Sequence, residues 1–344
     1  MKQIEDYEVK NVRAIASAFS RHPWQINNFL ESDAEIIEFN NKSIQYLVLK
    51  IDGIHEEINK KLYVDPFLIG WMSITVTISD LAAVGALPFG ILLSIQIPYE
   101  IDKVWFRHFQ KGINNACKIY QVNILGGDTN YDSSIAIVTT GIGTIADREK
   151  TLFRKKMTAG EMLYSTGKLG LGNAFAYAQY FDNSIKIKYQ PTARLRESKL
   201  ISDYATACMD TSDGLFPALS VLSEINHVGF NLVGSLQNIV HDEVLKIEKA
   251  SKLPLWIFLA GPHGEYELLF SIPVSKQKEF EDACRADNWT PIFIGEIVSN
   301  KKIQFISNNK TIKCQPAVIP NLFHKCNSNI QLYFDLLMKQ DANW

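Results

Sequence analysis

The sequence predicts a protein of two domains in which helices and strands are mixed, and three observations lead to this expectation. The chain has 344 residues, enough for two domains of ordinary size. Strand-like runs and amphipathic helical patterns alternate along most of its length. A charged break, Asp147–Lys150, separates two such blocks. We therefore expect an N-terminal domain of residues 1–148 and a C-terminal α/β domain of residues 149–344.

Composition and charge limit the classes of function. Hydrophobic residues make up 47% and charged residues 21% of the chain, the balance of a globular protein with a large core. A net charge of −2 gives no electrostatic basis for binding nucleic acid, and no apolar run is long enough to span a bilayer. The polar N-terminus lacks a signal-peptide core, and five scattered cysteines suggest free thiols. We therefore expect a cytoplasmic protein whose partner is a small molecule.

Strand and helix patterns follow one another in the first block. Residues 66–86 are ambiguous, because their middle alternates like a strand while the same apolar residues also fit one helical face. The other elements are clearer: strands at Ile44–Ile51, Ile91–Ile97 and Ser134–Ile145, and an amphipathic helix at Val104–Tyr120.

An apolar run, Val122–Leu125, leads into Gly126, Gly127, Asp128 and Thr129. We interpret the run as a buried strand, after which two glycines would let the backbone turn and leave room for a bulky group. Asp128 at such a strand end would suit a Mg²⁺ ligand that faces nucleotide phosphates. A plain turn between two strands explains the same pattern, and this alternative stays open here.

The second block contains a glycine-rich loop with Gly167, Gly170 and Gly172. It follows an expected strand at Glu161–Thr166 and opens an expected helix at Phe175–Phe181. A loop at a helix N-terminus is suited to binding an anion, although the spacing of a Walker loop is absent. A plain strand-to-helix turn is the alternative. Further on, we expect a strand at Leu268–Ile272, a helix at Lys276–Ala286 and a strand at Pro291–Ile297.

Several oxygen donors precede the expected helix Phe216–Ile225. Ser212 or Asp213 could cap that helix, but capping needs only one of them and does not explain Asp210. Grouped oxygen donors suit Mg²⁺ better than a cap. His263, in a later glycine-rich turn with Glu265, is a weaker candidate, because a lone histidine in such a turn is more often structural.

Three motifs, in this order, resemble one superfamily: Asp80–Pro88, Gly126–Thr129 and Asp210–Leu215. The superfamily includes thiamine-monophosphate kinase, aminoimidazole ribonucleotide synthetase, selenophosphate synthetase and a hydrogenase maturation factor. The second and third motifs are similar to the kinase versions. The resemblance extends over roughly residues 30 to 300.

The resemblance implies a two-domain α+β fold, with a helix in residues 68–85. It also implies that the N-terminal sheets of two chains pair into a barrel and form a homodimer. It implies Mg²⁺- and ATP-dependent phosphoryl transfer to a small acceptor, with Asp210 and Asp213 nearest the transferred group. Matched by motif, the metal ligands would be Asp33, Asp52, Asp80, Asp128, Asp210 and Asp213. The nucleotide would contact Gly126, Gly127, Asp128, Thr129 and Ser212, and the loop of Gly167, Gly170 and Gly172 would line the site.

Departures from the kinase motifs bear on the acceptor. Tyr131 stands where the kinases have an arginine, and Met72 stands about where they have a lysine. Because fewer cations beside a phosphate site weaken binding of an anion, we expect thiamine monophosphate to be a poor acceptor. Tyr131, His263 and Glu265 would then face a less charged acceptor. Replacement cations could come from Lys60, Lys61 or Arg154.

Two alternatives to a kinase stay open. One is an ATP-dependent synthetase that activates a carbonyl or amide oxygen. The other is a nucleotide-binding paralogue without turnover, suggested by the altered positions Ser32, Gly53, Tyr131 and His263.

Overall fold

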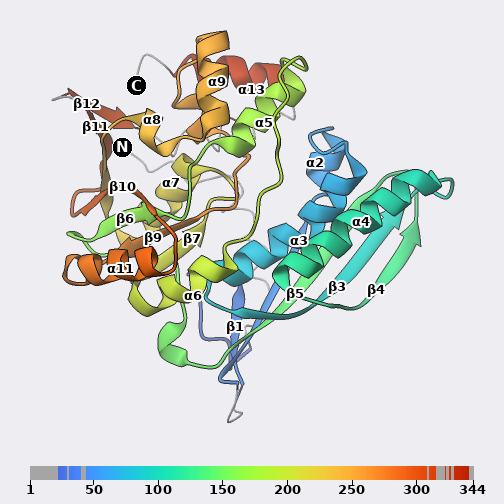
Figure 1. Cartoon of the computed structure of the whole chain (residues 1–344), viewed down its shortest axis with the longest axis horizontal. Helices are drawn as coiled ribbons and strands as arrows, with labels where there is room; N and C mark the ends of the chain where they lie inside the picture. The colour runs from blue at the N-terminus through green and yellow to red at the C-terminus, as the bar shows by residue number, and fades with distance from the viewer. Residues whose placement is uncertain are drawn as a thin grey trace.

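The computed structural model describes residues 22–28, 31–39, 44–307, 310–314, 322, 325–326 and 329–340. These residues form two β-sheets with helices packed on them (Figure 1). The first sheet has five strands in the order β1-β2-β5-β3-β4. Their bounds are β1 Glu35–Glu38, β2 Tyr46–Gly53, β3 Leu87–Ile97, β4 Ile124–Tyr131 and β5 Ala136–Ile145.

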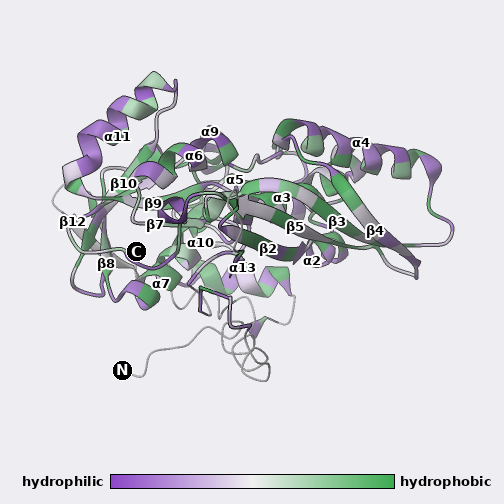
Figure 2. Ribbon diagram, turned by 90° about the horizontal axis from the view of Figure 1, so that it is seen from below, coloured by the Kyte–Doolittle hydropathy of each residue, from purple (hydrophilic) through white to green (hydrophobic). Residues whose placement is uncertain are grey.

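Two long helices, α3 (Pro66–Ala83) and α4 (Lys103–Tyr120), pack together, and α3 lies against β2 and β5. A Cβ atom on Gly70 would lie 2.0 Å from the Phe109 carbonyl oxygen, so glycine is what allows the two helices to approach this closely. Figure 2 shows hydrophobic and hydrophilic residues mixed along α4, as expected of an amphipathic helix.

The helical prediction for residues 68–85 is confirmed, since α3 spans Pro66–Ala83. Asp65 caps α3 by accepting a hydrogen bond from the Phe67 amide, and Pro66 occupies the first helical position. By length and composition α3 could cross a membrane, but 89% of it is buried inside the protein. Its β-branched residues are tolerated because burial against the sheet outweighs local propensity.

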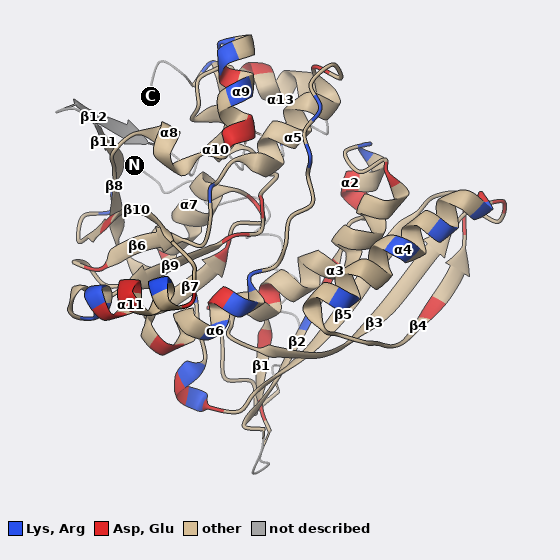
Figure 3. Cartoon of the chain, in the orientation of Figure 1, with Lys and Arg blue, Asp and Glu red and all other residues tan. Residues whose placement is uncertain are grey.

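The other face of the first sheet carries exposed apolar residues. Ile51 and Leu92 both pair with Thr140, so they lie in one row across three strands. Ile51 is 66% exposed and Leu87 is 62% exposed. β3 carries no charged residue (Figure 3). α3 packs against β2, β3 and β5, while these apolar residues stay exposed, so the sheet has one covered and one open face.

The structure corrects the prediction for the Gly-Gly-Asp segment. The motif does not follow a buried strand and does not form a turn, because β4 runs through Ile124–Tyr131 as an exposed edge strand parallel to β3. A Cβ atom on Gly127 would lie 2.1 Å from the Leu93 carbonyl oxygen. Glycine at this position therefore permits close approach to β3, and Asp128 lies within the strand. Asp52, by contrast, lies at the end of its strand, because β2 ends at Gly53.

The second sheet has seven strands in the order β12-β11-β8-β10-β6-β9-β7. They are β6 Met162–Ser165, β7 Ala207–Asp210, β8 Gly229–Val233, β9 Leu268–Ile272, β10 Ile292–Val298, β11 Ile303–Ser307 and β12 Lys310–Cys314. The remaining α-helices are α2 His55–Asn59, α5 Leu171–Tyr180, α6 Leu195–Tyr204, α7 Leu215–Asn226, α8 Leu236–Ile239, α9 Asp242–Ser251, α10 Ile257–Ala260, α11 Val274–Ala286 and α13 Ile330–Met338. A 3₁₀ turn occupies Arg148–Lys150. Helix α3, which packs on the first sheet, also contacts β7 and α6, so α3 connects the two sheets.

Candidate active site

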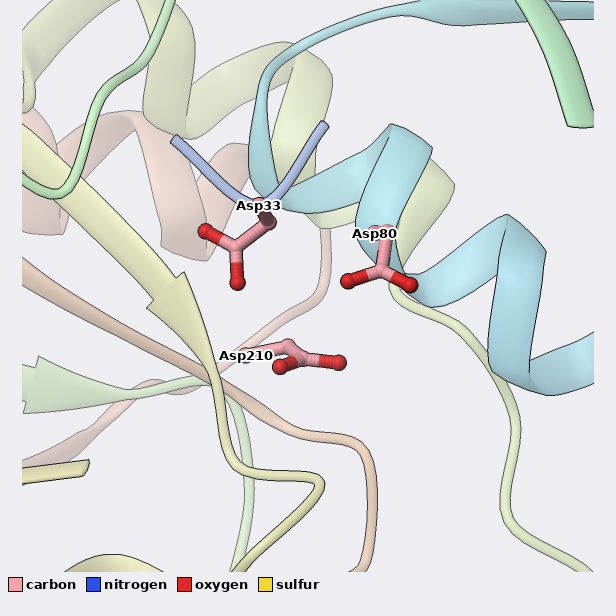
Figure 4. A group of neighbouring side chains, drawn as sticks. All are labelled: Asp33, Asp80 and Asp210. Atoms are coloured by element: carbon pink, nitrogen blue, oxygen red, sulfur yellow. The ribbon is translucent and has the colours of Figure 1, made fainter. Parts of the chain in front are cut away.

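Three buried carboxylates, Asp33, Asp80 and Asp210, meet where α3 reaches the second sheet. One oxygen atom from each lies within 4.8 Å of the others, and Figure 4 shows the three side chains pointing toward one another. Asp33 precedes β1, Asp80 lies in the last turn of α3, and Asp210 is the last residue of β7. The sequence motifs had placed all three among the candidate metal ligands.

Asp210 is held by two serine hydroxyls. Ser79 donates to Oδ2 over 2.7 Å, and Ser212 donates to Oδ1 over 3.0 Å. Burial, together with the charge of Asp33, raises the pKa of Asp210 to about 6. Ser212 does not cap α7, whose N-cap is Gly214 with no side-chain cap. Ser212 therefore positions the Asp210 carboxylate and does not cap α7.

Asp33 is held by Arg154, which donates from Nη2 to Oδ1. The second oxygen, Oδ2, is buried and has no hydrogen-bond partner among the described residues. An unpartnered buried carboxylate oxygen is costly, and a cation among the three carboxylates would satisfy it. Because Mg²⁺ prefers carboxylate oxygens, these residues fit that ion.

Lys50 lies beside the three carboxylates, and the sequence motifs did not predict it as a residue of the site. Its Nζ atom is 3.2 Å from Asp80 Oδ2 and 3.6 Å from Asp52 Oδ2. Burial raises the pKa of Asp80 well above its ordinary value, against the opposing effect of the Lys50 charge. The signal in the sequence is the spacing of two between Lys50 and Asp52, which places both side chains on one face of a strand.

Two other predicted metal ligands, Asp128 and Asp213, lie outside the group of three aspartates within the single chain. Asp128 is exposed on β4 and accepts a 2.6 Å hydrogen bond from Asn130, and its neighbours Gly126, Gly127 and Thr129 are exposed too. Asp213 is exposed beside Ser212. Tyr131, 53% exposed, stacks on Tyr99 with ring centroids 5.1 Å apart. Their roles in binding remain predictions.

The glycine-rich loop packs against a buried acidic segment. Gly170, with φ of 87°, is the N-cap of α5, and its amide donates a 2.7 Å hydrogen bond to Glu265. Burial raises the pKa of Glu265 to about 8. A Cβ atom on Gly167 would lie 2.7 Å from Glu267, and one on Gly172 would lie 2.0 Å from the Gly264 carbonyl oxygen. Glu265 thus occupies the helix N-terminus that we expected a phosphate to approach, and a nucleotide role for the loop stays untested.

His263 lines a cavity with aromatic walls. Burial lowers the pKa of His263 to about 4, so its ring is neutral at pH 7. The next residue, Gly264, donates a 2.7 Å hydrogen bond to the Ser212 carbonyl oxygen, which connects the cavity wall to the aspartates. The Tyr180 hydroxyl is buried without a hydrogen-bond partner in the described part of the chain. The aromatic walls are Tyr177, Tyr180, Phe181 and Phe334.

The sequence comparisons agree with the resemblance inferred from the motifs. Residues 31–145 match the family of the AIR synthase related protein, N-terminal domain. The thiamine-monophosphate kinase of Pyrococcus horikoshii is 31% identical over 252 residues, which cover 72% of this chain and 78% of that protein. The thiamine-monophosphate kinase of Methanospirillum hungatei is 33% identical over 233 residues, covering 67% and 77%.

Solved structures show the same fold. AaThiL complexed with AMPPCP and TMP matches with a TM-score of 0.70 at 23% identity, covering 90% of this chain and 95% of that one. The HypE–HypF complex matches with a TM-score of 0.71 at 16% identity, covering 88% and 98%. Together with the buried aspartates, the sequence relatives show that this chain belongs to the thiamine-monophosphate kinase family and is an ATP-dependent kinase.

Proposed function

We propose that this kinase transfers the γ-phosphoryl group of ATP to thiamine monophosphate, with Mg²⁺ held by Asp33, Asp80 and Asp210. The observation that carries the proposal is this buried group of carboxylates with its unpartnered oxygen. When bound, Mg²⁺ would offset the negative charge of the transferred group, which is the main requirement of phosphoryl transfer. The guanidinium of Arg154 and the two serine hydroxyls keep the carboxylates oriented before any ligand enters.

The acceptor proposed here is the one that the sequence departures argued against. Met72 is fully buried in the core of the first sheet, so this position does not present a side chain to solvent. Lys50 supplies a cation 3.2 Å from Asp80, which the motif comparison had not counted. The aromatic cavity next to His263 offers walls suited to planar rings. Family membership and these three features favour thiamine monophosphate, and steady-state kinetics decides between this proposal and the expectation of a poor acceptor.

Steady-state kinetics with ATP and thiamine monophosphate tests the proposal. We expect ADP and a stable phosphorylated product in equal amounts, with a kcat/KM in the ordinary enzyme range of about 10⁴ M⁻¹s⁻¹ or more. A much lower value would restore the expectation of a different acceptor. Release of free phosphate along with the product would identify a synthetase, and ATP binding without turnover would identify a non-catalytic paralogue.

Calorimetry with ATP tests the metal. Binding should require Mg²⁺ and weaken in Asp210→Asn, because that variant loses an anionic oxygen ligand. Asp203→Asn is the matched control, since Asp203 pairs with Lys150 on the surface. Equal ATP affinity with and without Mg²⁺ would remove the basis for a metal at these aspartates.

We also propose that the chain forms a homodimer through the open face of the first sheet. Exposed apolar residues on a sheet face, next to a fully exposed edge strand, are typical of a surface that another subunit covers. Pairing of two such sheets into a barrel is part of the proposal. Leu87, Leu92 and Ile51 would lie in the interface.

The division into two domains near residue 148 belongs to the proposal as well. The first sheet ends at Ile145 and the second begins at Met162, which supports a boundary between them. Residues 1–21 and 341–344, the outer ends of the two domains, lie outside the described residues. A cytoplasmic location is supported by the free thiols of Cys117, Cys208, Cys284 and Cys326.

A further inference from the structure

Lys50 lies on the face of β2 that packs toward the protein core. Alternate residues of β2 face α3, and Tyr46 and Val48 on that face are buried. Lys50 and Asp52 continue the same face toward the last turn of α3, where Asp80 lies. A lysine on the covered face of a strand is unusual unless its charge is paired, and here two carboxylates pair with it.

The charges around Lys50 leave room for one divalent ion. Four carboxylates, those of Asp33, Asp52, Asp80 and Asp210, gather around the ammonium of Lys50 and the guanidinium of Arg154. Fully ionised, this group has a net charge of two negative units, which a single Mg²⁺ neutralises. Without Lys50, the same group would have three negative units and a gap between Asp52 and Asp80.

We propose that Lys50 is a built-in cation that takes the place of a second divalent ion between Asp52 and Asp80. A Mg²⁺ ion bridging these carboxylates would lie about 2.1 Å from its oxygen ligands, in the same gap that the ammonium occupies. Repulsion at this range also opposes joint occupancy. Asp33, Asp80 and Asp210 would then hold one ion. This inference rests on the proposed function, because it takes Mg²⁺ as the ion that the carboxylates bind.

Counting bound Mn²⁺ on the full-length chain without nucleotide tests the inference. Mn²⁺ takes the same oxygen ligands as Mg²⁺, and free Mn²⁺ can be measured by electron paramagnetic resonance. We expect one ion per chain in the unaltered protein and an additional ion per chain in Lys50→Met. Lys50→Arg keeps the charge and should bind the same number as the unaltered protein. Lys150→Met is the matched control, since it removes a lysine paired with Asp203 on the surface.

A double variant assigns the additional ion. Lys50→Met combined with Asp52→Asn should bind the original ion and lose the additional one. If Lys50→Met is unfolded by circular dichroism, Lys50→Gln takes its place in the same measurement. An unchanged number of ions in the folded variant would overturn the inference. Phosphoryl transfer to thiamine monophosphate is measured separately on the unaltered protein, so the proposed function can stand when the inference fails, or fail when it stands.

Discussion

The Ser79 hydroxyl donates a 2.7 Å hydrogen bond to Asp210, and this bond links α3, which packs on the first sheet, to β7 of the second sheet. Both partners are buried. A hydrogen bond to a buried carboxylate is stronger than one between neutral groups, because little solvent competes for it. Because Asp80 follows Ser79 directly in the chain, this bond fixes the position of Asp210 relative to Asp80.

The first prediction concerns this bond. Ser79→Ala leaves a buried carboxylate oxygen without its donor, so the free energy of unfolding should fall by about 1–3 kcal/mol, measured by urea denaturation. Turnover should fall further than in Ser73→Ala, which removes a buried hydroxyl of the same helix bonded to the Gly70 carbonyl. Equal losses of turnover in the two variants would show that Ser79 has no particular role at the site.

The second prediction concerns pH and stability. Burial raises the pKa of Glu265 from its ordinary value of 4.5 to about 8, so the folded state holds this proton where the unfolded state has released it. The contribution of Glu265 to the free energy of unfolding is thus fully present below pH 4.5 and is lost as the pH rises toward about 8. Urea denaturation at several pH values should show this decline in the unaltered chain and a smaller decline in Glu265→Gln. Glu296→Gln, on the exposed side of β10, should keep the full decline, and a Glu265→Gln profile identical to it would contradict the prediction.

The third prediction concerns the aromatic cavity. Phe334 lies on α13 with its ring centroid 4.6 Å from that of Phe181, and both line the cavity beside His263. Phe334→Ala removes one wall, so KM for thiamine monophosphate should rise about tenfold while KM for ATP stays within about twofold. Phe293→Ala is the control, because that ring contacts Tyr164 on the second sheet. A parallel rise in both KM values would indicate a general loss of structure instead.

The fourth prediction concerns the open sheet face. Leu92→Glu places a charge in the proposed interface, and a buried unpaired charge is costly, so a dimer of the unaltered chain should become a monomer by light scattering. Val274→Glu, at another exposed apolar position at the start of α11, should remain a dimer. Monomers in the unaltered chain, or dimers in Leu92→Glu, would exclude this face as the interface.

The sequence predicts most elements of the fold because their patterns are local. The strand at Leu268–Ile272 is found with the expected bounds, and the helix that the family resemblance placed at residues 68–85 is found as α3. Asp80 and Asp210 lie at the ends of their elements, as the motifs indicated. These features depend on periodicity, caps and short motifs, which one stretch of sequence contains.

Long-range pairing accounts for what could not be predicted. The run before Asp128 resembles a buried strand, but parallel pairing with β3 places it at an exposed edge. Gly170 resembles the start of an anion site, but its amide donates instead to the side chain of Glu265, which lies 95 residues away in the sequence. Nothing in the local sequence distinguishes Lys50 from other strand residues, because its partner Asp80 comes from α3. In each case the deciding contact comes from a distant segment.

The sheet order also determines when the site can form during synthesis. β7 lies at the edge of its sheet and pairs with β9, so Asp210 has no strand to hold it until Leu268–Ile272 has been made. A nascent chain that has emerged from the ribosome only as far as α10 already contains all three aspartates, yet it lacks their arrangement. Because β9 completes the arrangement, we expect phosphoryl transfer to become possible only after Leu268–Ile272 has been made.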